Sequence, residues 1–251
     1  MSAATASAGW DVLGWAQPAP ALQAELDARL DDDSRAAYAA ARQRVTDDPG
    51  SLDVVFPATG RTVGRAPLAP GDTTGLLGSV DDLARVLLLL AATDRADLAR
   101  HLYRDGDAAE RRAVVRALHL LPAAGDVDDL LADALRTNDP RLVAAAMGPA
   151  ADALDDDAWR QAVLKCLFTG VPLACVHRLQ ERRDDTLEVM AARYVAERVA
   201  AGRDVPADVG DVLPPDSPAL EHAGLSEAEQ GGHPDRLAAA ARARELLLPR
   251  S

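Results

Sequence analysis

The chain has 251 residues, of which 48% are hydrophobic but only 3% aromatic, and its formal net charge is −13 at pH 7. This length suffices for one or two domains with a buried core, and a core so poor in aromatic residues must consist of Ala, Leu and Val, which favours closely packed helices. The charge argues against a general nucleic-acid-binding protein and against a protein that binds anionic membranes, because both need a basic surface.

Targeting and redox features are sparse. Residues 1–28 lack the basic start of a signal peptide, and the longest strongly apolar run, Val86–Ala92, is too short to span a bilayer. Two cysteines, nine residues apart, provide no disulfide framework. We therefore expect a cytoplasmic protein without a transmembrane segment.

The N-terminal region begins with small and polar residues, and we expect residues 1–19 to be mobile. A first helix is predicted after Pro20. A second helix begins at Asp33 or Ser34, either of which can cap it, and ends before Asp48. The pattern therefore indicates two helices before a less regular segment.

A segment rich in Gly and Pro occupies residues 57–78, and the preceding residues 51–56 fit either a helical turn or an extended piece. Eight Gly and Pro in 22 residues predict a loop, and loops of this length in a compact domain are usually functional or disordered. Arg61 and Arg65 each follow a glycine in this segment. One reading is an anion site, because Arg matches phosphate or carboxylate oxygens. The other is that both arginines pair with acidic residues and hold the loop in place.

A sixteen-residue repeat organises the chain from Leu98 to Leu167. Residues that are almost all apolar return at the same helix positions, which is the pattern of amphipathic helices. Two such helices make a 32-residue unit, typical of stacked helical hairpins. We therefore predict an all-α protein, specifically a HEAT-like α-solenoid with a 16-residue half-repeat. The four columns are Leu98, Val114, Leu130, Ala146, Ala162; Ala99, Val115, Leu131, Met147, Val163; Leu102, Leu118, Ala134, Ala150, Cys166; and Tyr103, His119, Leu135, Ala151, Leu167.

Capping residues agree with this register. Asp81 or Asp82 is placed to start the helix before the repeat. Asp107, with Glu110 three residues later, has the spacing of a capping box. Asp139 is followed by a proline, which suits the first position of a helix.

The repeat stops at Gly170, which suits a left-handed helix end. Two further helices are predicted, from Leu173 to about Arg183 and from Asp185 to Gly202, as a cap on the open end of the stack. The predicted parts of the chain are a mobile N-terminus (1–19), N-terminal helices with the loop (20–80), the solenoid with its capping helices (81–202), and a linker with a tail helix (203–251).

Three residues in the repeat region carry reactive groups. Cys166 has His177 eleven residues later, the elementary pair for a thiolate nucleophile, but its column places it on a buried stripe, where Cys acts as a small hydrophobe. His119 replaces a core-type residue, which suits a core histidine or a proton-transfer group. Lys165 projects from the opposite face of its helix and is either solvated or directed at the concave surface.

Partner-surface candidates follow the same helix. Phe168 shares the exposed side with Lys165, and Arg178 and Arg182 come just after the repeat, although nearby acidic residues favour a self-paired, solvated face there. No P-loop, dinucleotide fingerprint, nucleophile elbow or metal-ligand spacing occurs in the sequence. We therefore expect no catalytic motif, no cofactor and no metal.

Three segments resemble the EboA family: Phe56–Arg65 (FPATGRTVGR), Lys165–Leu173 (KCLFTGVPL) and Tyr194–Val205 (YVAERVAAGRDV). The resemblance extends roughly over residues 20–212. It implies a bacterial protein encoded with a UbiA-like prenyltransferase, a TatD-like hydrolase and sugar-isomerase-like proteins, in clusters associated with moving or completing secondary-metabolite precursors. It supplies context rather than a mechanism.

Two functional hypotheses follow. The first is a non-catalytic accessory protein that docks a partner enzyme of the same gene cluster, or holds a precursor in secondary-metabolite (prenylated or isoprenoid-type) biosynthesis or export. The second is an enzyme or carrier for a small phosphorylated or carboxylated metabolite, in which Arg61 and Arg65 clamp the anion and Lys165 or His119 performs the chemistry. A scaffold without any ligand is a third reading, and no nucleic-acid partner is expected.

Overall fold

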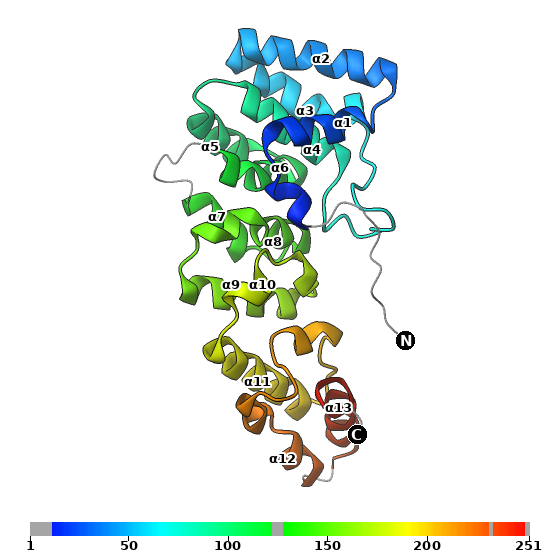
Figure 1. The fold of residues 1–251 in the computed structure, drawn as a ribbon, viewed down its shortest axis with the longest axis vertical. Coiled ribbons are helices and arrows are strands. Elements are labelled where there is room, and N and C mark those ends of the chain that lie inside the picture. Colours follow the sequence, from blue (N-terminus) through cyan, green and yellow to red (C-terminus); the bar gives the residue numbers. More distant parts are fainter. Residues whose placement is uncertain (1–11, 122–127, 231–232, 249–251) are drawn as a thin grey trace. The chain divides into compact units, whose positions relative to one another are not determined.

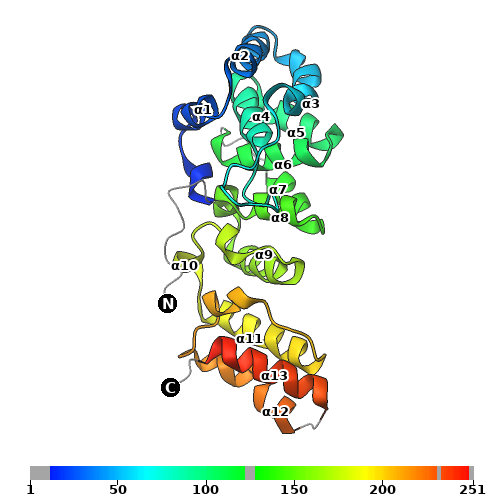
Figure 2. The ribbon, with the colours of Figure 1, turned by 90° about the vertical axis from the view of Figure 1, so that its right-hand side faces the viewer.

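A computed structural model describes residues 12–121, 128–230 and 233–248 of the chain (Figures 1 and 2). These residues form α-helices and short 3-10 helices without any strand; their β-type pairing is limited to an isolated antiparallel bridge between Pro67 and Ser79. The all-α class is therefore confirmed. The chain divides into two compact units, residues 1–155 and 156–251. In the described ranges, no helix is both long and apolar enough to cross a membrane.

Unit 1 contains the N-terminal helices and most of the repeat. Its 3-10 helices are η1 (Val12–Ala16), η2 (Pro49–Ser51), η3 (Leu118–Leu120) and η4 (Pro149–Ala153). Its α-helices are α1 (Ala19–Asp27), α2 (Asp32–Asp47), α3 (Leu52–Val63), α4 (Val80–Ala91), α5 (Arg95–Asp105), α6 (Ala108–Ala117), α7 (Asp128–Arg136) and α8 (Pro140–Ala146).

The predicted helix starts are correct to within a few residues. The cap of α2 is Asp31 rather than Asp33 or Ser34; its carboxylate accepts a hydrogen bond from the Ser34 amide at 2.8 Å. Asp107 and Asp139 cap α6 and α8 as expected. Side-chain acceptors thus satisfy amides that the first turn of each helix leaves free.

Helix α3 corrects the prediction for the Gly- and Pro-rich segment. Residues 57–63 are helical, with Pro57 inside the helix and Gly60 one turn later. A Cβ on Gly60 would lie only 2.7 Å from Arg65 Nε and 3.2 Å from Asp81 Oδ2. The glycine is therefore a site of close approach between α3 and these charged groups, rather than a helix breaker. The helix ends at Gly64, whose φ is +79°.

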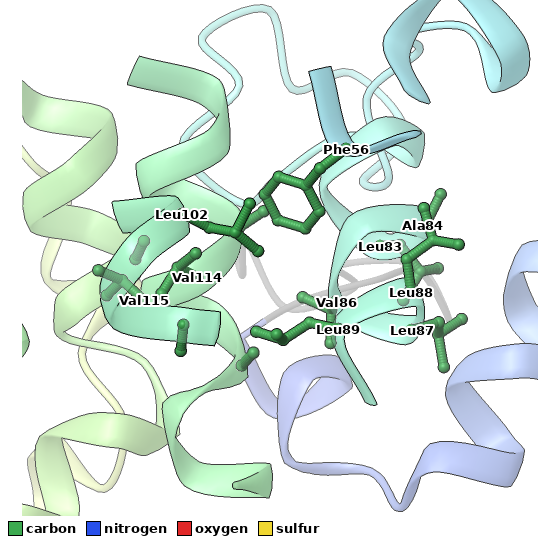
Figure 3. Packing of buried hydrophobic residues seen from close by; sticks show 14 of the residues in the cluster. Phe56, Leu83, Ala84, Val86, Leu87, Leu88, Leu89, Leu102, Val114 and Val115 are labelled. Carbon is green, nitrogen blue, oxygen red and sulfur yellow. The ribbon is translucent and has the colours of Figure 1, made fainter. Parts of the chain in front are cut away.

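Helix α4 is the centre of unit 1, because it contacts α1, α2, α3, α5 and α6. Contact on all sides explains why every residue from Val80 to Leu89 is buried. Helix α6 packs on both α4 and α8, and the three follow one another in both views (Figures 1 and 2). Figure 3 shows the aliphatic side chains between α4 and its neighbours, with Phe56 of α3 among them.

The repeat columns predict burial well. Of the twenty column positions, all are buried except four that are half-buried: Leu98, His119, Leu130 and Leu135. The helices that carry the columns are α5, α6, α7 and α8 with the 3-10 turns after α6 and α8 in unit 1, and α9 in unit 2. The HEAT-like arrangement itself stays a prediction.

Unit 2 contains 3-10 helices η5 (Leu173–Cys175), η6 (Ala207–Asp211) and η7 (Pro218–Ala223). Its α-helices are α9 (Asp156–Thr169), α10 (Leu179–Arg182), α11 (Asp185–Ala200), α12 (Leu225–Gln230) and α13 (Pro234–Leu247). The helix predicted over Leu173–Arg183 is thus two short pieces, while Gly170 ends α9 with φ +72°, as expected.

The segment expected to be a linker is part of the packed unit. Val205, Val209, Val212 and Leu213 are buried, as are two alanines of η7, Ala219 and Ala223. The tail helix α13 contacts α11 and α12. The Pro- and Gly-rich composition predicts a linker, but the apolar residues between the prolines provide enough surface for burial.

Candidate functional site

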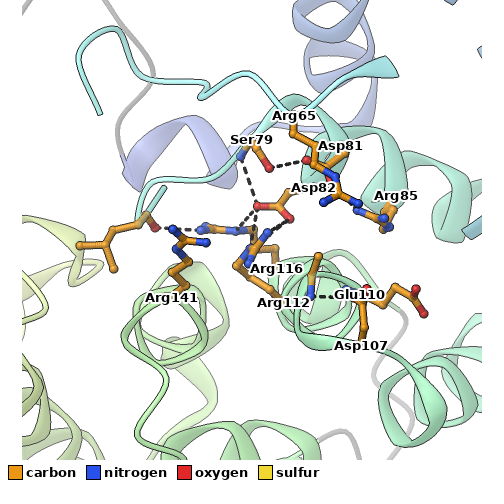
Figure 4. Close-up of polar contacts among 12 residues, drawn as sticks. Arg65, Ser79, Asp81, Asp82, Arg85, Asp107, Glu110, Arg112, Arg116 and Arg141 are labelled. Carbon is orange, nitrogen blue, oxygen red and sulfur yellow. Dashed lines mark hydrogen bonds and ion pairs between the residues drawn. The ribbon is translucent and has the colours of Figure 1, made fainter. Parts of the chain in front are cut away.

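Six charged side chains of α4 and α6 are buried (Figure 4). They are Asp81, Asp82 and Arg85 of α4, and Glu110, Arg112 and Arg116 of α6. Charges rarely leave water unless they are paired and hydrogen-bonded, because desolvation costs several kcal/mol per ion. The geometry of the cluster must therefore satisfy each group.

Asp82 accepts hydrogen bonds from Arg112, a residue of α6. Arg112 Nε lies 2.9 Å from Asp82 Oδ2 and 3.1 Å from Oδ1, and its Nη2 lies 2.9 Å from Oδ1. The amide of Ser79 also donates to Asp82, at 3.2 Å. Asp81 accepts from Arg85 Nη1 at 2.6 Å, and Arg85 Nε donates to the Phe56 carbonyl at 2.9 Å. The cluster joins α3, α4 and α6 through charge-assisted hydrogen bonds.

The loop of residues 64–79, between α3 and α4, is anchored beside this cluster. Arg116 Nη2 donates to the Leu76 carbonyl at 2.8 Å, and the Trp15 indole N–H donates to the Leu77 carbonyl at 2.8 Å. The guanidinium of Arg116 lies 4.5 Å from the centroid of the Trp15 ring, a cation–π distance. Arg141 Nε of α8 donates to the Thr74 carbonyl at 2.9 Å.

These elements border an open cavity of about 470 Å³, which we call the arginine cavity. Its walls are the 64–79 loop, the first turns of α4 and α6, and Arg141 from α8. It is lined by Arg65, Pro67, Asp72, Thr73, Gly75, Ser79, Asp81, Asp107, Ala108, Ala109, Arg112 and Arg141.

The carboxylates that line the cavity are already engaged by donors. Burial raises the pKa of Asp72, but hydrogen bonds from Thr74, Gly75 and Leu77 outweigh it and hold the pKa below its usual value. Asp107 accepts from the amides of Ala109 and Glu110. Asp81 accepts from Arg85, as described above, and from the Ser79 hydroxyl at 2.6 Å. All three carboxylates therefore accept hydrogen bonds from groups that form the walls of the cavity.

The arginines of the cavity keep donors for a ligand. Arg141 is exposed, is held by a neutral carbonyl and makes no ion pair within the described ranges. The Arg65 side chain is 66% exposed and lies 3.9 Å from Asp81, a loose pair. Arg112 uses Nε and Nη2 on Asp82, so its Nη1 is not part of that pair. Three guanidinium groups on one cavity suit an anionic ligand.

The residues singled out from the sequence do not form one site. Arg65 lines the arginine cavity, as an anion site requires, and it also pairs loosely with Asp81, as the loop-holding interpretation predicts. Arg61 is exposed on α3 and is not part of the lining. His119 borders a different, smaller hollow of about 200 Å³, and its Nε2 lies 2.7 Å from the Trp15 carbonyl oxygen. Lys165 belongs to α9 in unit 2.

The partner-surface candidates all lie in unit 2. Phe168 is 62% exposed and makes an edge-to-face contact with Tyr194, with ring centroids 4.7 Å apart. Arg178 Nε donates to Glu181 at 2.6 Å. Arg182 lies over the Trp159 ring and pairs with Asp156 at 3.2 Å. Both arginines thus have acidic partners, as the mixed charges of this segment predict.

Cys166 is a core residue. It is fully buried, and burial raises the pKa of its thiol to about 12. A thiol that stays protonated at neutral pH is a poor nucleophile. The buried-stripe reading of Cys166 is therefore correct.

Sequence reasoning missed the arginines that matter most, Arg85, Arg112, Arg116 and Arg141. Charged residues are read as surface by default. A signal was present: Arg116 lies within the run of residues 113–118, in which all the other residues are apolar. A charged residue among apolar neighbours is a candidate for burial, and a buried charge needs a partner.

The fold and the site define an all-helical protein with a polar, arginine-lined cavity. The chain belongs to the EboA family: the model described as "Metabolite traffic protein EboA" matches residues 74–213. Arg112 and Arg141 lie in the matched range, as do two of the three resembling segments, whereas Phe56–Arg65 precedes it. No curated protein and no solved structure matches the chain.

Proposed function

We propose that this EboA-family protein is a non-catalytic accessory protein that binds a small anionic metabolite in the arginine cavity. One observation carries the proposal: Arg65, Arg112 and Arg141 border one cavity whose carboxylates are already engaged by amides, a hydroxyl and Arg85. The family description, metabolite traffic, is consistent with a metabolite-related accessory role.

The size and chemistry of the cavity suit binding. Pockets for small molecules usually have volumes of roughly 300–1,000 Å³, and this cavity has about 470 Å³. Guanidinium groups stay protonated at physiological pH and form paired hydrogen bonds with carboxylate or phosphate oxygens. Such groups bind an anion but do not exchange protons with it. This supports a protein that binds a metabolite over an enzyme that converts it.

We propose that the protein transfers the bound metabolite to a partner enzyme of the same gene cluster, in secondary-metabolite biosynthesis or export. The alternative of a reactive site with Arg61, Arg65 and Lys165 or His119 has less support. Arg61 does not line the arginine cavity, and His119 borders a different hollow.

The test is isothermal titration calorimetry of the full chain with glycerol 3-phosphate, citrate and inorganic phosphate, with glycerol as the neutral control. We expect at least one anion to bind, and the double variant Arg65→Gln/Arg141→Gln to weaken that binding by roughly tenfold or more, since each charged hydrogen bond contributes about 1.5–3 kcal/mol.

Arg61→Gln is the matched control, because Arg61 is an exposed arginine near Arg65 that does not line the cavity. It should leave the affinity unchanged. Failure of all three anions to bind, or an equal loss in Arg61→Gln, would contradict the proposed site.

A further inference from the structure

A second arginine-rich surface lies over α5, α6 and α7, and it meets the arginine cavity at Asp107 and Ala108. It consists of a hollow of about 620 Å³ that adjoins another of about 580 Å³. The two share Tyr103, Arg111, Asp133 and Arg136, and the larger one also includes Arg100 and Arg104. We call this surface the α5–α7 groove.

Arg111 is positioned by neutral groups rather than by a carboxylate. Its Nε donates to the Gly106 carbonyl at 3.0 Å, and its Nη2 donates to the Arg104 carbonyl at 3.2 Å. Its guanidinium lies 5.7 Å from the centroid of the Tyr103 ring. These contacts fix the side chain at the end of α5 without cancelling its charge, so the guanidinium is preorganised for an anion.

The other charges of the groove differ in how far they are neutralised. Arg104 is exposed and makes no ion pair in the described part of the chain. Arg136 pairs with Asp133 at 2.7 Å, and Asp133 also accepts from the Tyr103 hydroxyl at 2.8 Å. Arg100 donates to Asp97. The positive charges of Arg104 and Arg111 therefore remain available.

The larger hollow carries four arginines and two aspartates, Asp129 and Asp133, which is a local excess of two positive charges (4 − 2) in a chain of net charge −13. The smaller hollow adds Asp107 and Asp139, helix caps whose oxygens accept from amides, so the excess of positive charge is confined to the larger hollow. An acidic partner is repelled by most of this protein and attracted to the larger hollow, which selects both partner and orientation.

We propose that the α5–α7 groove docks an acidic, Asp- and Glu-rich segment of a partner protein. The arginines come from three helices and border two adjoining hollows, each larger than the arginine cavity. An extended segment covers about 3.3 Å per residue, so several carboxylates of one chain reach successive guanidinium groups. A single small anion engages only one or two of them.

The experiment is fluorescence anisotropy with a fluorescein-labelled oligo-glutamate peptide and the full chain at low ionic strength. We expect the peptide to bind the wild type, and Arg104→Glu/Arg111→Glu to weaken binding by roughly tenfold or more, because surface charge pairs are strong at low salt. The control is Arg42→Glu/Arg44→Glu on α2, which changes the net charge equally at two exposed arginines.

Loss of the Arg111 contacts in the double variant can unfold the end of α5. The single variant Arg104→Glu then serves as the test, because the Arg104 side chain is exposed. The proposal is overturned if the wild type does not bind the peptide, or if the control loses as much affinity as the groove variant. Displacement by inorganic phosphate, but not by chloride at equal ionic strength, would assign the groove to a small anion instead.

This inference does not rest on the arginine cavity. The Arg65→Gln/Arg141→Gln variant should bind the peptide as the wild type does, because neither residue lines the groove. Loss of metabolite binding and loss of peptide binding are thus separable in the same set of proteins.

Discussion

Arg112 of α6 donates to both carboxylate oxygens of Asp82, a fully buried residue in the first turn of α4. This pair places a charged side chain of one central helix against the start of the other. Arg112 also lines the arginine cavity, so the stability of unit 1 and the geometry of the site depend on the same contact.

Replacing Asp82 by Asn should destabilise unit 1 strongly. The change keeps the shape of the side chain but leaves Arg112 and Arg116, whose Nε lies 3.7 Å from Asp82 Oδ2, buried without their anion. Breaking a buried pair in this way costs about 3–5 kcal/mol. Urea unfolding followed by circular dichroism measures the loss. Asp33→Asn, at an exposed position of α2, should cost less than about 1 kcal/mol; similar losses in the two variants would show that the cluster is not a major source of stability.

Gly78→Ala should be much more costly than Gly71→Ala. Both glycines have positive φ, +109° and +81°, a region that costs an L-residue roughly 1–2 kcal/mol. At Gly78 the new Cβ would also lie 2.6 Å from the buried Trp15 ring, whereas at Gly71 no atom lies within 4 Å. Thermal unfolding of the two variants isolates the steric contribution, and equal melting temperatures would mean that the loop does not pack on Trp15.

Unit 2 should lose stability in acid partly through Asp184. The hydrogen bond from Arg160 lowers the pKa of Asp184 below its ordinary value of 3.8. A carboxylate with a lowered folded pKa stabilises the fold above its unfolded pKa, and this contribution disappears as the pH falls through the folded pKa.

The test is Asp184→Asn, which removes the charge but keeps a good cap for α11, since Asn is as effective as Asp at this position. We expect this variant to be less stable than the wild type at about pH 7, with the difference shrinking below about pH 4. A difference that stays constant down to about pH 3 would assign the effect to something other than ionisation of Asp184.

The sequence carries enough information to predict the helices and most of the core. Sixteen-residue spacing placed residues such as Val115, Met147 and Cys166 on buried faces, because helix periodicity depends only on local geometry. It failed at Pro57 and Gly60, which lie inside α3. Helix α3 packs on α2 and α4, and tertiary contacts of this kind override local propensity.

The site was only partly predictable. Arg65 was found because its motif, Gly followed by Arg, is local. Arg112 and Arg141 become neighbours of Arg65 only when α6 and α8 pack beside the loop, and one sequence does not state which helices meet. Asp81 and Asp82 were read as caps, and their second role as buried partners of Arg85 and Arg112 depends on the same packing.

Three neighbouring side chains hold the 64–79 loop through its main chain. The carbonyls of Thr74, Leu76 and Leu77 accept the bonds from Arg141, Arg116 and Trp15. Every amino acid has such a carbonyl, so these three tethers place no demand on the side chains of the residues that carry them, whereas the loop still needs the Asp72 carboxylate and a glycine at position 78. Thr73 is exposed and lines the cavity, so its side chain can be exchanged without removing any of the three tethers.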